Sequence, residues 1–353
     1  DQTNYALYYR LKLNNYSAAL HVSKGDYDRD YYTVGAHNLY RATLKEYTLL
    51  NAYDYTVGKA VLGLEYKDID GLNHYISSFP SLPSESDYTN KAIYISNVYD
   101  IHESTLLETN LRYDHYNEFD SKTTYKIGLK HNHHFLEGVT TSANYYTAYD
   151  APSSYQLANQ SPTVNILKPA YTKGYDISAG YKELLLISYF HTRVEDSIDY
   201  VGLWPNAGYA NIDGTSKFSG LEIESTYSLD RYNIMISANY THLFDYKKED
   251  GTDLIRRAKD TLNASISYYT PNNMLFGLDA EYIGDRIDTD GGFPASEVST
   301  GNYTVWNLNF STEIIDDIDL TINAKNIFDK EYQSSYGYAT ADRSVYAKIK
   351  YNF

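Results

Sequence analysis

The sequence lacks several features that would place it in a common class. Its 353 residues include no cysteine, so no disulfide framework holds the chain, a composition that suits an oxidising exterior and many other settings equally. No run approaches the roughly 18 consecutive apolar residues of a membrane helix, which excludes a helical membrane protein. An excess of basic residues is also missing, because the net charge is −16, and this argues against a nucleic-acid-binding protein.

Catalytic motifs are missing as well. The sequence contains no Gly-x-Ser-x-Gly elbow, no His-Glu-x-x-His pair and no glycine-rich phosphate-binding loop. Its Ser, His and Asp residues show no spacing that indicates a catalytic triad. We therefore do not expect an enzyme.

The abundant feature is strict alternation of apolar and polar residues. In the last nine residues, from Val345 to Phe353, apolar side chains occupy every second position, and Lys348 and Lys350 lie between them. A period of two predicts a strand with one apolar face and one polar face.

The same alternation recurs along the chain, and no segment shows a sustained helical period with caps. The clearest examples are residues 7–13, 62–66, 107–114, 234–240, 276–282, 306–311 and 320–325. Such segments, joined by turns, predict an all-β, antiparallel protein built from hairpins.

Two all-β architectures compete, a soluble multi-sandwich and a membrane barrel. A sandwich fills its core with Leu, Val, Ile and Phe, whereas this chain has 42 Tyr and only 11 Phe. Several apolar stripes end in tyrosine, at Tyr66, Tyr113, Tyr240 and Tyr282. Tyrosine suits a lipid–water boundary, because its ring is apolar and its hydroxyl stays hydrated. The pattern favours a transmembrane antiparallel β-barrel, with Lys348 and Lys350 facing its lumen.

Short and long connections alternate between the predicted strands. Short ones are expected at Asn14-Asn15, Val57-Gly58, 100–104, Asp230-Arg231, 271–273 and Asp316-Asp317. Long ones are expected at about 26–39, 70–88, 149–170, 196–213, 246–256, 285–302 and 329–342. Outer-membrane barrels have short periplasmic turns, long external loops and even strand numbers. Our count is about seventeen strands, so we expect the later portion of a larger barrel.

Several segments, in the right order, resemble TonB-dependent outer-membrane receptors. Residues 326–332 (Asn-Ile-Phe-Asp-Lys-Glu-Tyr) are similar to the family's Asn-Leu-Phe-Asp-Lys-x-Tyr signature, and 151–157 (Ala-Pro-Ser-Ser-Tyr-Gln-Leu) to its Ala-Pro-Ser-Leu-Tyr-Glu-Leu segment. Further similarities lie at 165–169, 174–177, 219–222 and 337–343, before a terminal aromatic strand. Residues 256–259 and 336–343 look most like the cobalamin (vitamin B12) transporters, although catecholate-siderophore receptors share most of these features.

The resemblance implies a barrel of about 22 strands, closed by an N-terminal plug whose short box binds TonB. Neither plug nor box is present in this sequence, and its first strand, Asn4 to Leu13, looks like about the sixth of the family barrel. We therefore interpret residues 1–353 as a single outer-membrane β-barrel domain that is incomplete at its N-terminus. TonB would be reached only through the missing plug.

The function that the resemblance implies is active import across the bacterial outer membrane. The expected ligand is a scarce metal chelate, either cobalamin or a ferric siderophore, bound by the external loops and the lumen. Two alternatives remain open: a plugless passive diffusion channel, and a surface adhesin or structural barrel. Membrane lipid is an expected partner in each case.

Basic and aromatic residues in the long connections are the candidate ligand-binding residues. They are Arg256, Arg257, Lys259, Arg343, Trp204, Tyr209, Tyr336 and Tyr338. The basic side chains could hold an anionic chelate, or could equally neutralise lipopolysaccharide phosphates. The aromatic rings could stack on a flat ligand, or pack against one another.

Alternate carboxylates in two of these connections give a candidate calcium site. Asp26, Asp28 and Asp30 follow one another at a spacing of two, and Asp288, Asp290 and Gly291 resemble them in a later connection. Carboxylates at this spacing can converge on Ca²⁺. The alternative is a pair of solvated acidic loops on an acidic protein.

Overall fold

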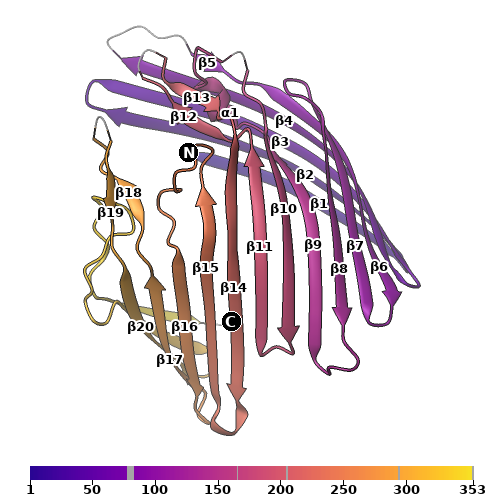
Figure 1. Ribbon diagram of the computed structural model, residues 1–353, viewed down its shortest axis with the longest axis vertical. Coiled ribbons are helices and arrows are strands. Elements are labelled where there is room, and N and C mark those ends of the chain that lie inside the picture. Colours follow the sequence, from indigo (N-terminus) through magenta and orange to yellow (C-terminus); the bar gives the residue numbers. More distant parts are fainter. Residues whose placement is uncertain (78–82, 165, 204–205, 293–294, 352–353) are drawn as a thin grey trace. The chain divides into compact units, whose positions relative to one another are not determined.

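The computed structural model describes residues 1–77, 83–164, 166–203, 206–292 and 295–351. In this part of the chain there are twenty-two strands, one five-residue α-helix and one short 3-10 turn (Figure 1). The hairpins of the described chain, among them β1–β2, β2–β3, β3–β4, β4–β6 and β14–β15, pair antiparallel, as the alternation predicts. None of the helices in the described ranges is long and apolar enough to cross a membrane.

The strand count agrees with the sequence prediction. Seventeen of the strands are eight residues or longer, and the other five have four residues or fewer. The short strands lie within connections that we expected to be irregular, so the extra elements leave the predicted number of long strands unchanged.

The chain forms two compact units. Unit 1 comprises residues 1–131, 142–175 and 192–216, and unit 2 comprises residues 132–141, 176–191 and 217–353. Five strands contribute residues to both units: β8 (Lys122–Asn132), β9 (Val139–Asp150), β10 (Ala170–Tyr181), β11 (Leu185–Glu195) and β14 (Thr215–Leu229).

Unit 1 is built on a run of long antiparallel hairpins. Its own strands are β1 (Gln2–Leu13), β2 (Tyr16–Thr33), β3 (Ala36–Tyr55), β4 (Gly58–Ser77), β5 (Ser84–Glu85), β6 (Tyr88–His102), β7 (Thr105–Tyr116), β12 (Ile198–Val201) and β13 (Gly208–Asn211), with the helix α1 (Ser154–Ala158). Each long strand pairs with the next, from β1–β2 through β4–β6 to β7–β8. The helix α1 packs against β4.

Unit 2 has the same hairpin construction with shorter strands. It contains η1 (Asp230–Tyr232), β15 (Ile234–Lys247), β16 (Asp260–Tyr269), β17 (Met274–Ile283), β18 (Ile287–Thr289), β19 (Glu297–Ser299), β20 (Tyr303–Ile315), β21 (Ile318–Lys325) and β22 (Ser344–Tyr351). Neighbouring strands pair from β14 to β17, and β17 then pairs with β20, β20 with β21 and β21 with β22. The strands β18 and β19 form a small separate hairpin in the connection that joins β17 to β20.

The predicted loop at 26–39 is wrong for most of its length. The β2–β3 hairpin continues to Thr33 and Ala36, and only Val34 and Gly35 form the turn. A transmembrane strand needs about 9–11 residues, so β3 and β4, with 20 residues each, continue well beyond that length. Cross-strand pairs such as Asp28 with Arg41 keep the charged segment in the sheet.

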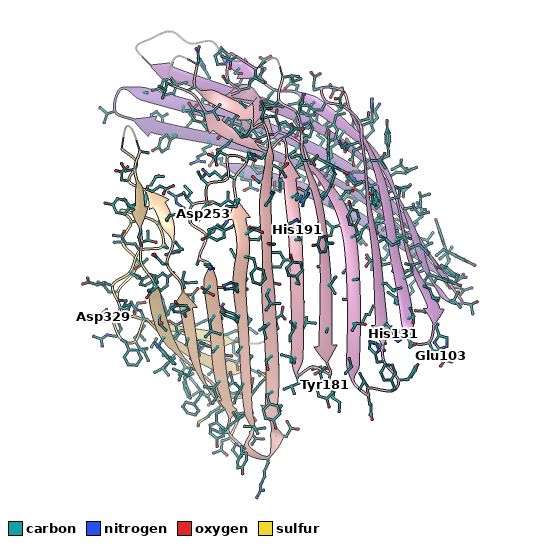
Figure 2. All side chains as sticks on the ribbon, in the orientation of Figure 1. Glu103, His131, Tyr181, His191, Asp253 and Asp329 are labelled. Carbon is teal, nitrogen blue, oxygen red and sulfur yellow. The ribbon has the colours of Figure 1, made fainter. Side chains whose placement is uncertain are left out.

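Four other predicted loops contain regular structure. The connection at 70–88 includes the end of β4 and all of β5, and 149–170 includes α1. The connections at 196–213 and 285–302 contain the hairpins β12–β13 and β18–β19. Figure 2 shows Glu103 at the short turn between β6 and β7, and Asp253 and Asp329 in the connections after β15 and β21.

The strands expose their apolar face and bury their polar face, which is the reverse of a soluble protein. Large apolar side chains on one face are exposed, including Ile93 at 48% in β6 and Leu111 at 50% in β7. Polar side chains on the other face are buried, including Asn90 and Asp114 at 2% and 4% exposure. Such a sheet suits an apolar environment outside and polar contacts inside. Phe353, the terminal aromatic residue, lies outside the described residues.

Candidate functional site

A capped helix, α1, interrupts the connection after β9. The Ser153 hydroxyl accepts a hydrogen bond from the Gln156 N–H (3.2 Å), and Gln156 Oε1 accepts one from the Ser153 N–H (2.9 Å). These reciprocal contacts form a capping box, which satisfies two N–H groups that the first turn would otherwise leave unpaired. The box therefore fixes where the helix begins.

The helix is bonded to the neighbouring strands β3 and β4. The Ser154 and Tyr40 hydroxyls are 2.8 Å apart, and the Asn73 side-chain N–H donates to Asn159 Oδ1 at 3.0 Å. Gly71 of β4 lies directly under the helix, where a Cβ would be 2.7 Å from the Cβ of Ser154. A side chain at position 71 would therefore hold α1 away from the sheet.

The hairpin β12–β13 joins the same assembly through Tyr209. The Tyr209 N–H donates to the Asn159 carbonyl, and the Tyr209 carbonyl accepts from the Ser161 N–H, both at 2.9 Å. The Tyr209 ring lies edge-on to Tyr155 and Tyr200, at centroid distances of 6.1 and 5.4 Å. This candidate residue thus packs among aromatic rings of its own unit. Trp204, the other aromatic candidate here, lies outside the described residues.

A cavity of about 390 Å³ opens beside α1. It is lined by Arg29, Tyr31, Asn38, Tyr40 and Tyr155. The register of the β2–β3 hairpin pairs Arg29 with Tyr40 and Tyr31 with Asn38, so these four residues share one face of the hairpin. None of the five was among the candidate ligand-binding residues, although Tyr155 lies in the 151–157 segment that resembles a family motif.

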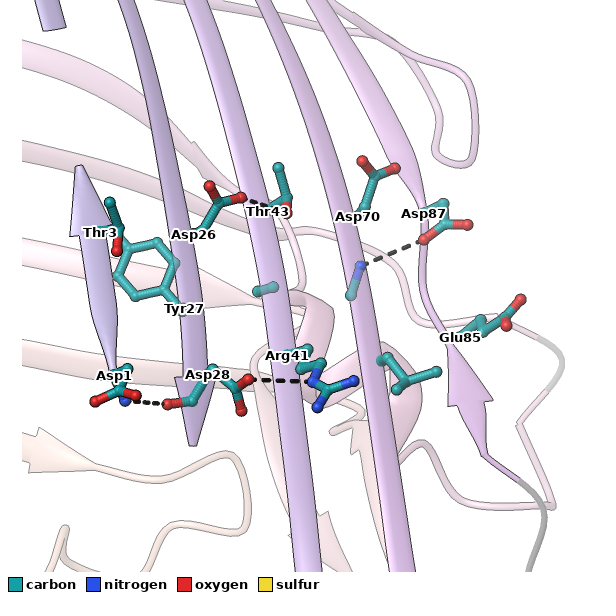
Figure 3. A pocket seen from close by; sticks show the side chains of 13 residues that line it. Asp1, Thr3, Asp26, Tyr27, Asp28, Arg41, Thr43, Asp70, Glu85 and Asp87 are labelled. Atoms are coloured by element: carbon teal, nitrogen blue, oxygen red, sulfur yellow. Dashed lines mark hydrogen bonds and ion pairs between the residues drawn. The ribbon is translucent and has the colours of Figure 1, made fainter. Parts of the chain in front are cut away.

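The opposite face of the same hairpin is acidic. Asp26, Asp28 and Asp30 lie there at alternate positions, and the first two line a cavity of about 610 Å³ (Figure 3). Asp26 contacts Lys24 at 2.7 Å and Asp28 contacts Arg41 at 3.2 Å. Asp30 contacts the ring of His37, also at 3.2 Å.

The calcium interpretation stays a prediction. Each of the three aspartates is already bonded to a neighbouring side chain. Among the residues that the structure describes, no group of three or more His, Cys, Asp or Glu side chains converges as metal ligands would.

In unit 2, the buried carboxylate of Asp288 joins three connections. Its side chain is 1% exposed, and Oδ1 accepts from Arg256 Nε at 2.9 Å and from the Thr289 N–H at 2.8 Å. Oδ2 accepts from the Ser335 hydroxyl at 3.0 Å and from the Tyr336 N–H at 2.8 Å. Asp288 is therefore a structural tie between the segments around residues 256, 288 and 336, and both of its carboxylate oxygens accept hydrogen bonds.

The electrostatics of Asp288 follow from these contacts. Burial by itself raises the pKa of a carboxyl group. The hydrogen bonds from the Tyr336 and Thr289 N–H groups, the Arg256 guanidinium and the Ser335 hydroxyl outweigh that effect and lower the pKa of Asp288 to about 2. The group is therefore a carboxylate at neutral pH.

The remaining candidates in unit 2 are held by separate contacts, and their role in binding stays a prediction. Asp288 brings Arg256 and Tyr336 together, although Tyr336 contributes only its backbone. Arg343 is held by its N–H, which donates to Asp329 Oδ1 at 2.8 Å. Arg257, Lys259 and Tyr338 have exposed side chains.

A capping-box signal in the sequence could have located α1, the helix that supplies Tyr155 to the cavity. Ser153 and Gln156 have the Ser-x-x-Gln spacing of a capping box, which marks the start of a helix. The pairing of Arg29 with Tyr40 depends on the register of a hairpin that we had interpreted as a loop, so no local pattern could indicate it.

Comparison with known proteins adds independent information. A family model described as "TonB dependent receptor-like, beta-barrel" matches residues 1–327. The vitamin B12 transporter BtuB of Vibrio cholerae (serotype O1, strain O395) is 27% identical over 256 residues, which cover 70% of this chain and 40% of that protein. The chain thus spans well under two thirds of the length of this curated relative.

Solved structures share the fold. The ferric enterobactin receptor PfeA of Pseudomonas aeruginosa, in a mutant form, has a TM-score of 0.77 at 17% identity, covering 100% of this chain and 61% of that one. The copper transporter OprC has a TM-score of 0.82 at 15% identity, covering 100% and 65%. At these identities the likeness concerns the fold alone.

Proposed function

Because the chain belongs to the TonB-dependent receptor-like β-barrel family, an outer-membrane family of transporters and receptors, we propose that it forms part of an active importer. The proposed cargo is a scarce metal chelate, either a cobalamin or a ferric siderophore. The curated relative named a vitamin B12 transporter supports the first, and the structural neighbour named a ferric enterobactin receptor supports the second.

The observation that carries this proposal is the cavity beside α1. A capped helix and a long hairpin enclose about 390 Å³ with aromatic and polar side chains, a volume within the usual range for ligand sites. A passive channel has no need of such an enclosure, because it works by leaving solutes unbound. The cavity therefore favours a receptor over a diffusion pore.

The polar face of unit 2 supports the same proposal. Glu224, Asp279 and Glu281, together with Ser and Asn side chains, line a cavity of about 450 Å³. A wall of this kind is wet and offers hydrogen bonds to a polar chelate along its path. The matching family model describes the barrel alone. We therefore propose that a plug segment, and not the barrel, contacts TonB and receives the energy for import.

Two measurements test the proposal on the purified full-length gene product. Titration with cyanocobalamin and with a ferric tris-catecholate should give nanomolar binding of one of them. Planar-bilayer recording should show no large, permanently open conductance. A stable open conductance without binding of either chelate would identify a passive channel and overturn the proposal.

A further inference from the structure

A groove opens on the exposed apolar face of unit 2. It has a volume of about 450 Å³ and is formed by β16, β17, β20 and β21. Its apolar side chains belong to two rows of direct cross-strand partners. In one row Tyr268 pairs with Phe276 and Phe276 with Phe310, and the other row ends with Leu308 paired to Ala324. The groove therefore crosses neighbouring strands of one continuous ladder.

The groove is apolar because alternation sends the polar side chains of the same strands to the opposite face. Asn309 also lines the groove, but its side chain donates a hydrogen bond to Asp279, which lines the polar cavity of unit 2. The Phe276 and Phe310 rings contact each other at a centroid distance of 5.0 Å and an angle of 45°. Ala324 has the smallest side chain of the two rows, so it leaves space that a larger residue would fill.

The groove adjoins the short turns of unit 2. Tyr268 is the last residue but one of β16, which is followed by the turn at 270–273. Because Met274 pairs with Thr312, β20 continues past this turn, and the tip of the β20–β21 hairpin, Asp316-Asp317, projects farther in the same direction. Short turns of outer-membrane barrels lie on the periplasmic side. The groove is therefore assigned to the periplasmic leaflet, and the hairpin tip to its headgroups.

The position of the groove identifies an acyl chain as its occupant. The apolar face of an outer-membrane barrel meets the hydrocarbon of the bilayer. A concave apolar surface contacts one flexible chain along more of its length than a flat surface does. A second copy of this protein fits less well, because a two-fold contact would set the same concave surface against itself and leave a void.

The charge at the hairpin tip favours one class of headgroup. Asp316 and Asp317 are exposed, and no ion pair among the described residues involves either of them. Glu313 adds a third carboxylate, whose Oε1 accepts a hydrogen bond from the Asp317 N–H at 3.4 Å. Carboxylates attract an ammonium group and repel an anionic headgroup. The tip therefore suits a zwitterionic lipid that carries an amine.

We propose that this groove binds one acyl chain of a glycerophospholipid whose headgroup carries an ammonium group. The chain packs against the Phe276–Phe310 ring pair and along Leu308 and Ala324, and the ammonium group lies beside the Asp316-Asp317 tip. Lipid tails are as apolar as the protein face, so packing contacts and the headgroup select this lipid, while hydrophobicity does not. The inference concerns the membrane-facing side of the protein and is independent of the imported cargo.

Native mass spectrometry of the purified full-length gene product, in a non-ionic detergent, tests the proposal. The protein is titrated with phosphatidylethanolamine and, separately, with phosphatidylglycerol that carries the same acyl chains. We expect a single phosphatidylethanolamine to bind about tenfold more tightly than phosphatidylglycerol. Equal affinity for the two lipids would refute the headgroup assignment, and a dimer that excludes lipid would refute the acyl-chain assignment.

Two alanine positions give a matched test of the groove. Ala324→Phe fills the groove and should weaken phosphatidylethanolamine binding about tenfold or more. Ala238→Phe adds the same bulk to the apolar face of β15, outside the groove, and should leave binding unchanged. Heat-modifiable migration on gels establishes that each variant is folded, and Ala324→Val provides a smaller filling with a smaller expected loss. Unchanged binding in folded Ala324 variants would overturn the proposal.

Two aspartates in short turns give a matched test of the headgroup contact. Asp316→Asn should reduce the preference for phosphatidylethanolamine over phosphatidylglycerol about threefold. Asp230→Asn removes the same charge from the turn between β14 and β15 and should keep the preference. Equal reductions in both variants would mean that the overall charge of the protein selects the lipid, which contradicts the role given to the hairpin tip.

Discussion

At the scale of single residues, an aspartate has different contacts and a different role in each of the two units. Asp28 lies on an exposed strand face and pairs with one arginine, while Asp288 is almost completely buried and accepts from four donors in three connections. Both were candidate calcium ligands by their spacing. Their hydrogen bonds and ion pairs give each carboxylate a structural role in its own setting.

Replacing Asp288 by Asn should loosen the connections that it joins. The amide keeps one acceptor but turns an N–H group toward hydrogen-bond donors, so a buried contact is lost at a cost of about 1–3 kcal/mol. Hydrogen exchange at the Tyr336 and Thr289 N–H groups should become faster by about tenfold or more.

Asp290→Asn is the control for this variant. Asp290 accepts from the Gly292 and Ser296 N–H groups within its own loop, so its replacement should leave exchange at Tyr336 unchanged. Equal acceleration at Tyr336 in both variants would contradict the role given to Asp288.

The pKa of Asp288 predicts how this tie depends on pH. The folded-state pKa, about 2, lies below the ordinary value of 3.8, so ionised Asp288 stabilises the tie at every pH above about 4. Its contribution is lost as the pH falls from about 4 through 2. Exchange at Tyr336, corrected for its intrinsic rate, should therefore accelerate in that window, and the Asp288→Asn variant should lack the change.

At the scale of elements, α1 is the one helix of the described chain whose position shapes the candidate site. Five residues are too few for a stable isolated helix, so its stability comes from the capping box and from bonds to Tyr40 and Asn73. The helix supplies Tyr155 to the cavity, and displacing it would remove one wall.

Gly71→Ala should displace α1 from the sheet. The new Cβ would lie 2.6 Å from the Ser86 hydroxyl and 2.7 Å from the Ser154 Cβ, so the helix must shift, at a cost of about 1–3 kcal/mol. Limited proteolysis should then cut between residues 151 and 164 more rapidly. In Gly180→Ala, where the nearest atoms are 3.5 Å away, the cutting rate should match that of the unsubstituted protein.

At the scale of the whole molecule, the inverted burial of the strands determines which substitutions are tolerated. Ile266 and Ser265 are neighbours in β16 with opposite orientations: Ile266 is exposed on the apolar face, and Ser265 lines the polar wall with Asp279 and Glu281.

Arginine at these two positions should have opposite effects on assembly. Ile266→Arg places a charge in the lipid at a cost of about 2–4 kcal/mol near the membrane centre, while Ser265→Arg meets acidic neighbours and water. The yield of folded protein, measured by heat-modifiable migration on gels, should fall for the first variant only. Loss of folding in both would mean that position 265 is not on a wet face.

The sequence allowed the all-β class, the seventeen long strands and the family to be predicted, because a period of two and a chain of motifs are local patterns. The cavity depends on contacts between residues more than a hundred positions apart, such as Tyr40 with Ser154, and these have no local signature. The loop candidates Arg257, Lys259 and Tyr338 were chosen by residue type alone, and their role as ligand contacts stays a prediction.

The two-sided β2–β3 hairpin also affects how the protein can change over time. Asp26, Asp28 and Asp30 contribute to one surface, and Arg29, Tyr31 and Asn38 to the other, although all lie within one short stretch of chain. A substitution at one set alters one surface and leaves the other intact. Substitutions can therefore accumulate on the acidic surface without changing the chemistry of the cavity on the other face, whereas a single-residue deletion would exchange the two surfaces.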